Sequence, residues 1–359
     1  MTTVLRAPRT LVAAAFAVAS TAAFAQTPSP WIEFSNQTAT RLPTAAAVTT
    51  DPDEKDLLIV DIDHDGDVDV FDIQKNDVYF SPSARTHRLF LNVGGTFIDG
   101  AAFVPFAANP SIGRLGICAD FTGDGWEDLV VVNTNDTGFG STTQQQLQFY
   151  RNLGNDPLGV WLGMTYDTAG RFPQYTTPYA RFCGGDHGDF DMDGDQDLYL
   201  GDYTNSLEDR LLFNDGTGVF TDVTTTNIPG GSASGFTVEV QVGDFNADGW
   251  PDIALSDPGS VRVRINNGAG VFVNTVSPPA PATYTLAVGD LNNDGKDDIY
   301  QGRDGQDGYN LSVGAVGSQT VTFTDVTLTN SPGTNAFAGN ATVVDMDNDG
   351  WNDVIMGDI

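Results

Sequence analysis

The nine residues Asp61-Ile-Asp-His-Asp-Gly-Asp-Val-Asp69 recur in varied form five more times in this chain of 359 residues. In all six copies the first, fifth and ninth places are Asp and the sixth is Gly, while the third is Asp, Asn or Thr. Successive copies start 59, 69, 55, 46 and 55 residues apart, a period typical of propellers, solenoids or arrays. The copies span residues 61–69, 120–128, 189–197, 244–252, 290–298 and 345–353.

Short strands are predicted on both sides of each copy. Runs such as Leu57-Leu-Ile-Val60 precede a copy and runs such as Leu129-Val-Val-Val132 follow one, and both are strand-length and rich in β-branched residues. A second sequence motif, Arg210-Leu-Leu-Phe-Asn214 followed by Gly216 and Gly218, predicts a hairpin with a Gly/Asn turn. Each repeat therefore holds about four strands, the size of a propeller blade. We predict an all-β fold: a β-propeller of about four-stranded blades with six visible repeats.

The oxygen atoms of the repeated nine residues indicate a metal site. The first, third, fifth and ninth places offer side-chain oxygens, the seventh offers a backbone carbonyl, and the glycine permits a sharp turn. Ligands made only of oxygen favour a hard cation, and calcium fits better than magnesium, which retains several waters. An EF-hand is excluded, because its loop lies between helices and carries Glu in its twelfth place. Up to six calcium ions are expected, and their candidate ligands are Asp61, Asp63, Asp65, Asp67, Asp69, Asp120, Thr122, Asp124, Trp126, Asp128, Asp189, Asp191, Asp193, Asp195, Asp197, Asp244, Asn246, Asp248, Trp250, Asp252, Asp290, Asn292, Asp294, Lys296, Asp298, Asp345, Asp347, Asp349, Trp351 and Asp353.

The nine-residue motif and the hairpin motif together resemble a known family. The Asp-x-Asp-x-Asp-Gly-x-x-Asp loop between strands, followed by Leu-x-x-Asn and Gly-x-Gly-x-Phe-x-Asp-Val-Thr, is similar to the FG-GAP/VCBS repeat of integrin-α-like β-propellers. The resemblance covers essentially Trp31 to Ile359. It implies blades around a central axis, with calcium loops that join the first and second strands of each blade. It implies less about activity, because the family includes adhesion proteins, lectin-like binders and non-catalytic parts of enzymes.

Residues 1–25 have the features of a bacterial secretory signal. Arg6 and Arg9 precede the apolar run Leu11–Ala23, and Ala23-Phe24-Ala25 forms a small-x-small cleavage site. The alternative is a membrane anchor, for which the run is short. We therefore expect a secreted, periplasmic or cell-surface protein with no transmembrane segment, whose propeller occupies residues 26–359.

The two ends of the repeat region suggest how the propeller closes. Phe34-Ser-Asn-Gln-Thr38 resembles Phe220-Thr-Asp-Val-Thr224, the last strand of a repeat, but has no hairpin before it. The sixth copy is followed by one strand that begins at Val354. We expect the N-terminal strand to complete the last blade. One strand is then still missing, so that blade has three strands or the chain is truncated, and a seventh blade stays open.

The charge and composition exclude several classes of protein. The chain carries 48 Asp and Glu against 16 Lys and Arg, a formal charge of −32, which disfavours nucleic acid and anionic membranes as partners. A content of 22 Phe, 10 Tyr and 5 Trp is too aromatic for a disordered acidic chain. Cys118 and Cys183 either pair in an oxidising compartment or remain free thiols.

Other candidate residues have a structural and a functional interpretation. We interpret the second place of each loop as a core plug beneath the loop, and the seventh-place tryptophans as packing residues, with sugar stacking as the alternative. His64, His87 and His187 are expected on loop surfaces, because none has a recognisable nucleophile partner. Asp202, Asp257 and Asp304 end strands and are expected to serve turns. The second-place residues are Ile62, Phe121, Phe190, Phe245, Leu291 and Met346.

The sequence favours a secreted, calcium-binding adhesion or ligand-recognition module. Its ligand is expected to be an extracellular carbohydrate or a protein. The alternative is a propeller enzyme, or an enzyme-associated domain, that acts on extracellular polysaccharide as a lyase or hydrolase. A third interpretation is a structural part of a larger surface protein.

Overall fold

A computed structural model shows an all-β chain whose described part holds five four-stranded sheets and one three-stranded sheet. The short helices are α1 (Thr38–Arg41), the 3-10 helix η1 (Phe106–Ala108) and α3 (Thr224–Asn227). The structure describes residues 2–6, 38–42, 54–75, 84–134, 146–175, 180–203, 208–229, 236–257, 260–278, 283, 285–303, 306–327 and 338–358.

Each four-stranded sheet consists of four strands in chain order, and we call each sheet a blade, numbered 1–6 along the chain. All paired strands are antiparallel. Blade 1 holds β2 (Glu54–Val60), β3 (Asp69–Gln74), β4 (Arg88–Val93) and β5 (Thr96–Asp99); blade 2 holds β6 (Gly113–Ala119), β7 (Asp128–Asn133), β8 (Gln148–Asn152) and β9 (Met164–Tyr166). Blade 3 holds β10 (Phe182–Gly188), β11 (Asp197–Asp202), β12 (Arg210–Asn214) and β13 (Phe220–Asp222); blade 4 holds β14 (Glu239–Gly243), β15 (Asp252–Asp257), β16 (Ser260–Ile265) and β17 (Asn274–Val276). Blade 5 holds β18 (Thr285–Gly289), β19 (Asp298–Gly302), β20 (Gly308–Val313) and β21 (Thr322–Asp325); blade 6 holds β22 (Ala338–Val344), β23 (Asp353–Asp358) and β1 (Thr2–Arg6).

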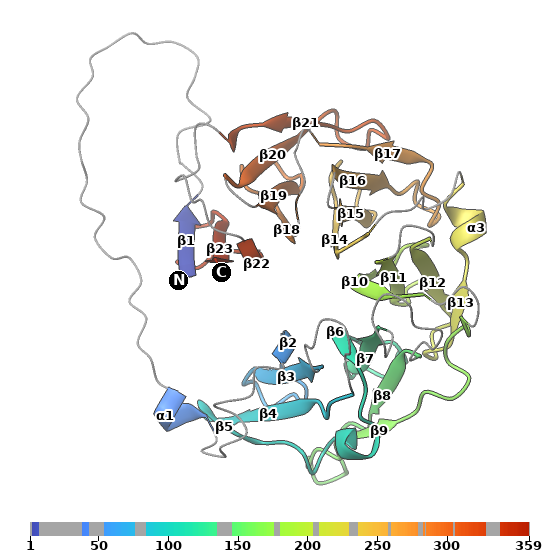
Figure 1. Ribbon diagram of the computed structural model, residues 1–359, viewed down its shortest axis with the longest axis vertical. Coiled ribbons are helices and arrows are strands. Elements are labelled where there is room, and N and C mark those ends of the chain that lie inside the picture. The colour runs from blue at the N-terminus through green and yellow to red at the C-terminus, as the bar shows by residue number, and fades with distance from the viewer. Residues whose placement is uncertain are drawn as a thin grey trace.

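The blades stand around a common centre in chain order, with the first strand of each innermost (Figure 1). Each of the six repeated loops joins the first and second strands of its blade, as the family resemblance implied. Neighbouring inner strands contact one another at five junctions, from β2 with β6 to β18 with β22. The arrangement is propeller-like.

Small residues at the ends of inner strands let adjacent blades approach closely. Gly243 ends β14 and Gly289 ends β18, and each faces the inner strand of the following blade. A Cβ atom at Gly243 would lie 2.5 Å from Val288 Cγ1, and one at Gly289 would lie 2.6 Å from Val343 Cγ1. Such distances leave no room for a side chain, so glycine sets the spacing of these blades.

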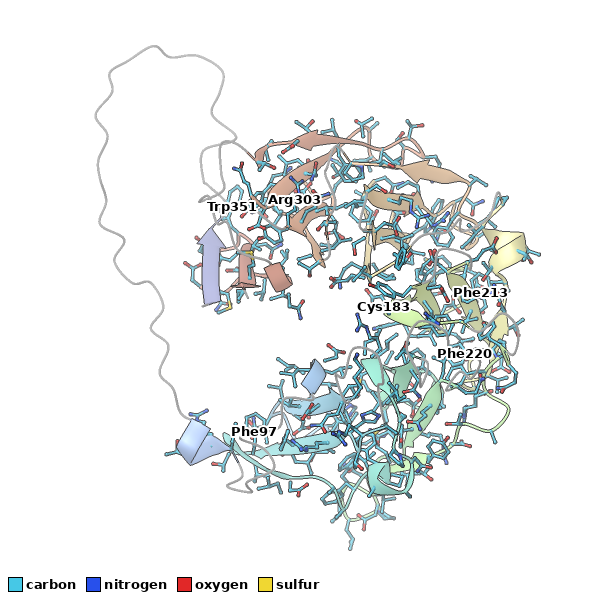
Figure 2. The ribbon with its side chains drawn as sticks, in the orientation of Figure 1. Phe97, Cys183, Phe213, Phe220, Arg303 and Trp351 are labelled. Atoms are coloured by element: carbon cyan, nitrogen blue, oxygen red, sulfur yellow. The ribbon has the colours of Figure 1, made fainter. Side chains whose placement is uncertain are left out.

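The hydrophobic core is divided into five clusters, one at each of the five packed junctions. Side chains fill the space between blades, as at Phe213 and Phe220 in blade 3 (Figure 2). Five of the six second-place loop residues belong to these clusters, and four of these five, Ile62, Phe121, Phe190 and Phe245, are fully buried. The prediction that they are core plugs is confirmed for these four and for the nearly buried Leu291, while Met346 is only half-buried.

The sixth junction differs from the other five. Figure 1 shows β22 and β2 farther apart than the other neighbouring inner strands, and no core cluster joins blades 6 and 1 among the described residues. Leu58 of β2 faces blade 2, where its side chain meets Gly116. Its neighbours Leu57 and Ile59 point the other way and are 61% and 70% exposed. The described sheets therefore do not form a closed ring.

The last blade is completed differently from our expectation. Its strand order is β1-β23-β22, and Thr2–Arg6 pairs with β23 in antiparallel register. Among the described residues the blade thus has three strands, but its third strand is Thr2–Arg6 and not the expected Phe34–Thr38. Of the segment expected to close it, residues 34–37 lie outside the described part, and Thr38 begins α1. The secretory signal stays a prediction: β1 lies within it, whereas the propeller was expected in residues 26–359, and its apolar run lies outside the described part.

Candidate functional site

The first-place aspartate organises each loop by accepting backbone hydrogen bonds. We number the six repeated loops 1–6 after the blades that hold them, from residues 61–69 to residues 345–353. In loop 1, the Asp65 N–H donates to Asp61 Oδ1 at 3.1 Å and the Gly66 N–H donates to Asp61 Oδ2 at 3.0 Å. The same pair of bonds forms in loops 2, 4, 5 and 6, and loop 3 has the glycine bond. Gly66 has a φ of 95°, a conformation that favours glycine, which explains the invariant sixth place.

The fourth place of the loops is also left-handed, which the sequence reasoning missed. His64, Met192, Ala247, Asn293 and Asn348 have φ between 55° and 64°, and the fourth place of loop 2 is a glycine with φ 67°. Left-handed backbone at a residue with a Cβ is uncommon and costs energy. The six loops therefore share one backbone conformation, although their fourth residues share no chemistry.

The ninth-place aspartate ties its loop to the third strand of the blade. In loop 3, Asp197 is fully buried, and its Oδ2 accepts the Phe190 N–H at 3.0 Å while its Oδ1 accepts the Asn214 N–H at 2.8 Å. Loops 1, 4 and 5 repeat this two-sided arrangement, and in loop 2 the third-place Thr122 N–H takes the place of the second-place N–H. Burial raises the pKa of these carboxyls, to about 6 at Asp69, about 7 at Asp128, about 8 at Asp197, about 8 at Asp252 and about 7 at Asp298, although backbone donors lower it. A neighbouring cation would favour their ionised form.

The donor set of three loops fits a hard divalent cation. In loops 1, 3 and 6 the first, third and ninth carboxylates offer oxygens that all lie within 4.8 Å of one another. In loop 3, Asp189 Oδ1 and Asp191 Oδ1 are buried and have no hydrogen-bond partner among the described residues. Burial and the neighbouring Asp193 raise the pKa of Asp191. When bound, calcium would supply the positive charge and the coordination that such oxygens lack.

The other three loops replace the third carboxylate by a neutral oxygen donor. In loop 4 the Asn246 side chain accepts the Asp248 N–H at 3.0 Å and donates to Asp248 Oδ2 at 2.8 Å. Loop 5 carries in addition a cation of its own, because Lys296 Nζ lies 2.6 Å from Asp294 Oδ2 and the lysine is nearly buried. The ammonium group would compete with a metal ion for the fifth-place carboxylate. The sequence analysis assigned calcium ligands to all six loops in the same way, whereas in the structure loop 5 differs by the ion pair between Lys296 and Asp294.

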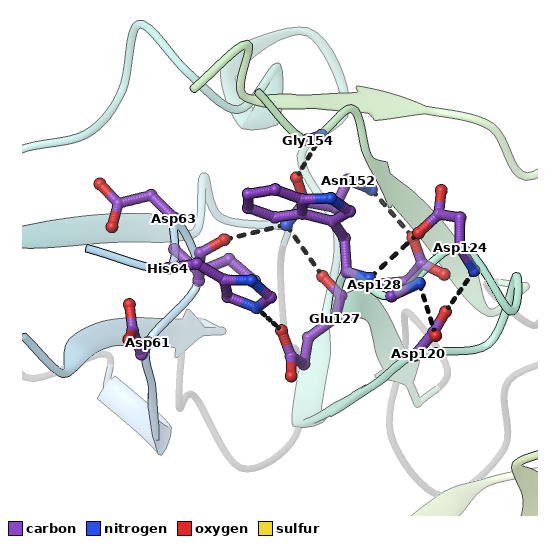
Figure 3. A network of polar contacts seen from close by, with 12 residues as sticks. Asp61, Asp63, His64, Asp120, Asp124, Glu127, Asp128, Asn152 and Gly154 are labelled. Atoms are coloured by element: carbon purple, nitrogen blue, oxygen red, sulfur yellow. Dashed lines mark hydrogen bonds and ion pairs between the residues drawn. The ribbon is translucent and has the colours of Figure 1, made fainter. Parts of the chain in front are cut away.

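Two of the seventh-place tryptophans, Trp126 and Trp250, pack within the protein, as we favoured from the sequence. Trp126 stacks on His64 of the adjacent loop, with ring centroids 4.2 Å apart and an interplanar angle of 13° (Figure 3). Gly154, in the turn that follows β8, lies directly against the Trp126 indole. Trp250 lies in the same way against Gly268. Both packed faces of Trp126 exclude it as a stacking platform for a sugar ring.

The three histidines occupy different environments, and the surface prediction is wrong for His87. His87 is buried, its Nδ1 accepts the Gln74 N–H at 3.0 Å, and its Nε2 lies 2.8 Å from Ser111 Oγ. Because Nδ1 accepts, neutral His87 carries its proton on Nε2 and donates it to Ser111, so it is no base toward that hydroxyl. Burial lowers the pKa of His87 to about 4. His64 lies in loop 1 and pairs with Glu127 at 2.6 Å, and His187 is partly buried on β10.

The remaining sequence candidates serve the fold. Asp202 accepts the Arg181 N–H at 2.8 Å, and Asp257 Oδ2 lies 2.7 Å from Arg262 Nε, while Asp304 lies outside the described part. Cys118 and Cys183 are free thiols. Cys183 lies on an inner strand near the centre of the blades (Figure 2), where the Arg114 guanidinium donates to its sulfur.

The asparagine at the end of the third strand is a site residue that sequence reasoning missed. Asn152 of blade 2 is fully buried between loops 1 and 2 (Figure 3), and its Nδ2 donates to Ile62 O at 2.9 Å and to Glu127 O at 3.2 Å. The phrase that ends in Asn was visible in the sequence, but it suggested only a turn. Asn lies 23, 24, 17 and 14 residues after its ninth-place Asp in blades 1–4, and this variable spacing hides the link.

A comparison with protein-family models agrees with this geometry. Residues 189–255 and 244–300 match the model of the FG-GAP-like repeat. The chain carries FG-GAP-like repeats. The two matched regions contain loops 3, 4 and 5, and the same hydrogen bonds extend the repeat to loops 1, 2 and 6.

One solved structure of low sequence identity shares the fold, and a second match is weaker. A lectin of Agrocybe aegerita, described by its specific recognition of non-reducing terminal N-acetylglucosamine, is 18% identical with a TM-score of 0.51; the match covers 85% of this chain and 75% of the lectin. The V. cholerae biofilm matrix protein Bap1 is 14% identical with a TM-score of 0.35, and the match covers 69% of this chain and 35% of Bap1. No curated protein sequence matches the chain significantly. In the described part, no helix is long and apolar enough to cross a membrane.

Proposed function

We propose that this chain is a secreted, calcium-stabilised β-propeller that recognises an extracellular ligand, with carbohydrate as the favoured class. The observation that carries the proposal is the joining of the repeated loop to the turn after the third strand in blades 1–4. In blade 3, the Asn214 N–H donates to the loop carboxylate Asp197, and Asn214 Oδ1 accepts the N–H of the turn residue Gly218 at 2.9 Å. In these four blades the loops and the turns are therefore held together as a rigid surface.

A rigid surface suits recognition, because little conformational entropy is then lost on binding. The likeness of the fold to a lectin supports carbohydrate as the ligand class. The packed tryptophan Trp126 implies that sugars would be bound by polar groups and by the rims of the loops, not by stacking on this ring. The acidic chain also favours neutral glycans over anionic ones.

A protein ligand is the second candidate, on one specific observation. The turn between β8 and β9 exposes three aliphatic side chains in close succession, Leu158, Val160 and Leu162. Apolar residues gathered on one turn are typical of a protein contact.

Calcium is the cation we propose for the loops. Its ligands would be the first, third, fifth and ninth side chains, with carboxylates at all four places in loops 1, 3 and 6. A cation there would stabilise the folded state by mass action, because the unfolded chain does not assemble the site.

A glycan array, probed with the chain in calcium and again in excess chelator, tests the recognition proposal. We expect binding to a defined set of neutral glycans in calcium and its loss in chelator. Release of oligosaccharides from a bound polysaccharide would replace the proposal by the enzyme alternative. Absence of glycan binding by a folded, calcium-loaded chain would refute carbohydrate as the ligand class.

A further inference from the structure

In blades 2, 3 and 4, one buried asparagine side chain contacts the repeated loops of two blades at once. Each Nδ2 carries two hydrogens and donates to two backbone carbonyls, one in the preceding blade's loop and one in its own. The bonds run from Asn152 to Ile62 O and Glu127 O at 2.9 and 3.2 Å, from Asn214 to Phe121 O and Gln196 O at 2.8 and 3.1 Å, and from Asn266 to Phe190 O and Pro251 O at 2.8 and 3.1 Å.

The two carbonyls hold equivalent positions in every case. The first belongs to the second place of the preceding loop, so its peptide leads directly to the third-place ligand. The second belongs to the eighth place of the asparagine's own loop, so its peptide leads to the ninth-place ligand. For Asn266, these ligands are Asp191 in loop 3 and Asp252 in loop 4.

A third bond fixes the asparagine to the ligand set itself. The Asn266 backbone N–H donates to Asp252 Oδ1 at 2.7 Å, and the corresponding bond of Asn152 to Asp128 is 2.9 Å long. Asn266 Oδ1 accepts the N–H groups of Gly268 and Gly270, so its amide cannot rotate without breaking several bonds. A shift of one loop is therefore transmitted to the next.

We propose that Asn152, Asn214 and Asn266 are positioning residues that couple cation binding in adjacent loops; this inference rests on the proposed binding of calcium. A cation that fixes the third-place ligand of one loop fixes the peptide beside it, and through the amide also the ninth-place ligand of the next loop. Binding in the second loop then orders fewer groups. Linkage requires the effect to be reciprocal, and couplings of this kind typically change affinity by about five-fold or more.

Blades 5 and 1 differ from blades 2, 3 and 4 at the position of the bridging asparagine. Blade 5 carries Ser312 in place of the asparagine; its N–H still binds Asp298 at 2.8 Å, while its hydroxyl is too short to bridge two loops. Blade 1 carries Asn92, which makes the bonds to its own loop, at Asp69 and Val68. Its described bonds reach no second loop, in keeping with the unpacked junction between blades 6 and 1. The coupling is thus expected in a run from loop 1 to loop 4.

Terbium luminescence can measure cation binding at one loop at a time. Trp250 lies in the seventh place of loop 4 and sensitises terbium bound there, in a full-length background with Trp126→Phe and Trp351→Phe. A chain with Trp250→Phe added gives the baseline. Loop 3 is disabled by Asp189→Asn, and the link is removed by Asn266→Ser, the residue that blade 5 tolerates at this position. Asn266→Asp is a second way to remove the link, because it keeps the side-chain volume and lacks the two Nδ2 hydrogens. Asn92→Ser is the matched control.

We expect Asp189→Asn to weaken terbium binding at loop 4 by about five-fold or more when Asn266 is present. The effect should vanish with Asn266→Ser and with Asn266→Asp, and should persist with Asn92→Ser. An equal effect of Asp189→Asn with and without Asn266, or no effect in the parent chain, would overturn the coupling while leaving cation binding intact. Absence of Trp250-sensitised emission in the parent chain would overturn the proposed cation binding itself.

Discussion

Replacing Asp189 by asparagine should have opposite effects on stability in the absence and in the presence of calcium. Asp189 Oδ2 accepts the Gly194 N–H at 3.0 Å, a bond that an asparagine oxygen keeps. Its Oδ1 is buried without a hydrogen-bond partner among the described residues and belongs to a carboxylate cluster with Asp191 and Asp197. An amide group there removes one negative charge and offers a donor to that cluster. In chelator, the free energy of unfolding should therefore stay within about 0.5 kcal/mol or rise.

In calcium the same substitution removes a ligand. A site filled at one hundred times its dissociation constant contributes about 2.7 kcal/mol to the free energy of unfolding. Asp189→Asn should thus lower the stability in calcium by about 2–3 kcal/mol, which exceeds any gain from the lost repulsion. The sign of the effect depends on the cation alone, because the backbone bond is kept in both conditions.

Urea unfolding of the two chains, in excess chelator and in millimolar calcium, measures both effects. Asp215→Asn is the matched control: Asp215 is an aspartate of the same blade whose Oδ1 accepts the Thr217 N–H at 3.0 Å in a turn outside the loop. Asp215→Asn should change the free energy of unfolding by the same amount in chelator and in calcium. If Asp189→Asn lowers the free energy of unfolding as much in chelator as in calcium, the carboxylate is not a calcium ligand and the reasoning fails.

Three further outcomes are expected. Phe190→Ala should lower the free energy of unfolding by about 3–5 kcal/mol in urea titrations, because Phe190 is fully buried between blades 3 and 4; a cost below about 1 kcal/mol would contradict its role as a plug. Lys296→Met should raise the calcium affinity of loop 5 in calorimetric titration, since the ammonium beside Asp294 is removed; an unchanged affinity would show that the ion pair does not compete. The folded pKa of His87 is lowered to about 4, so the unfolded chain alone takes up a proton as the pH falls from about 6.5 to about 4, and stability drops by up to about 3 kcal/mol. His87→Gln should flatten the unfolding free energy over that pH range, and a parallel curve would refute the assignment.

Much of the fold could be predicted from the sequence because its signals are local. The alternation of loops and strands was visible at each copy of the phrase, and the loops indeed join β2 to β3, β6 to β7 and their equivalents. The plugs could be predicted from periodicity, and Ile62 and Phe121 are fully buried. The packing of Trp126 followed from the general burial of tryptophan, although its partner His64 did not.

The errors concern residues whose surroundings come from elsewhere in the chain. His87 precedes β4 and looked like a loop residue, but Ser111 and Phe106 of the following segment bury it. The last blade takes β1 as its third strand, and no local pattern in Thr2–Arg6 predicted this pairing with β23.

By itself, the sequence determined six loops of metal-ligand spacing, the strands around them and the all-β class, because each depends on residues within about a dozen positions. Only the tertiary structure decided how the loops are linked. Asn152, Asn214 and Asn266 reach carbonyls that lie 90, 93 and 76 residues away, in blades that pack side by side. Among the described residues, the same packing forms a core cluster at five junctions and none between blades 6 and 1. Contacts of this kind depend on which surfaces meet around the centre, and no local repeat encodes that.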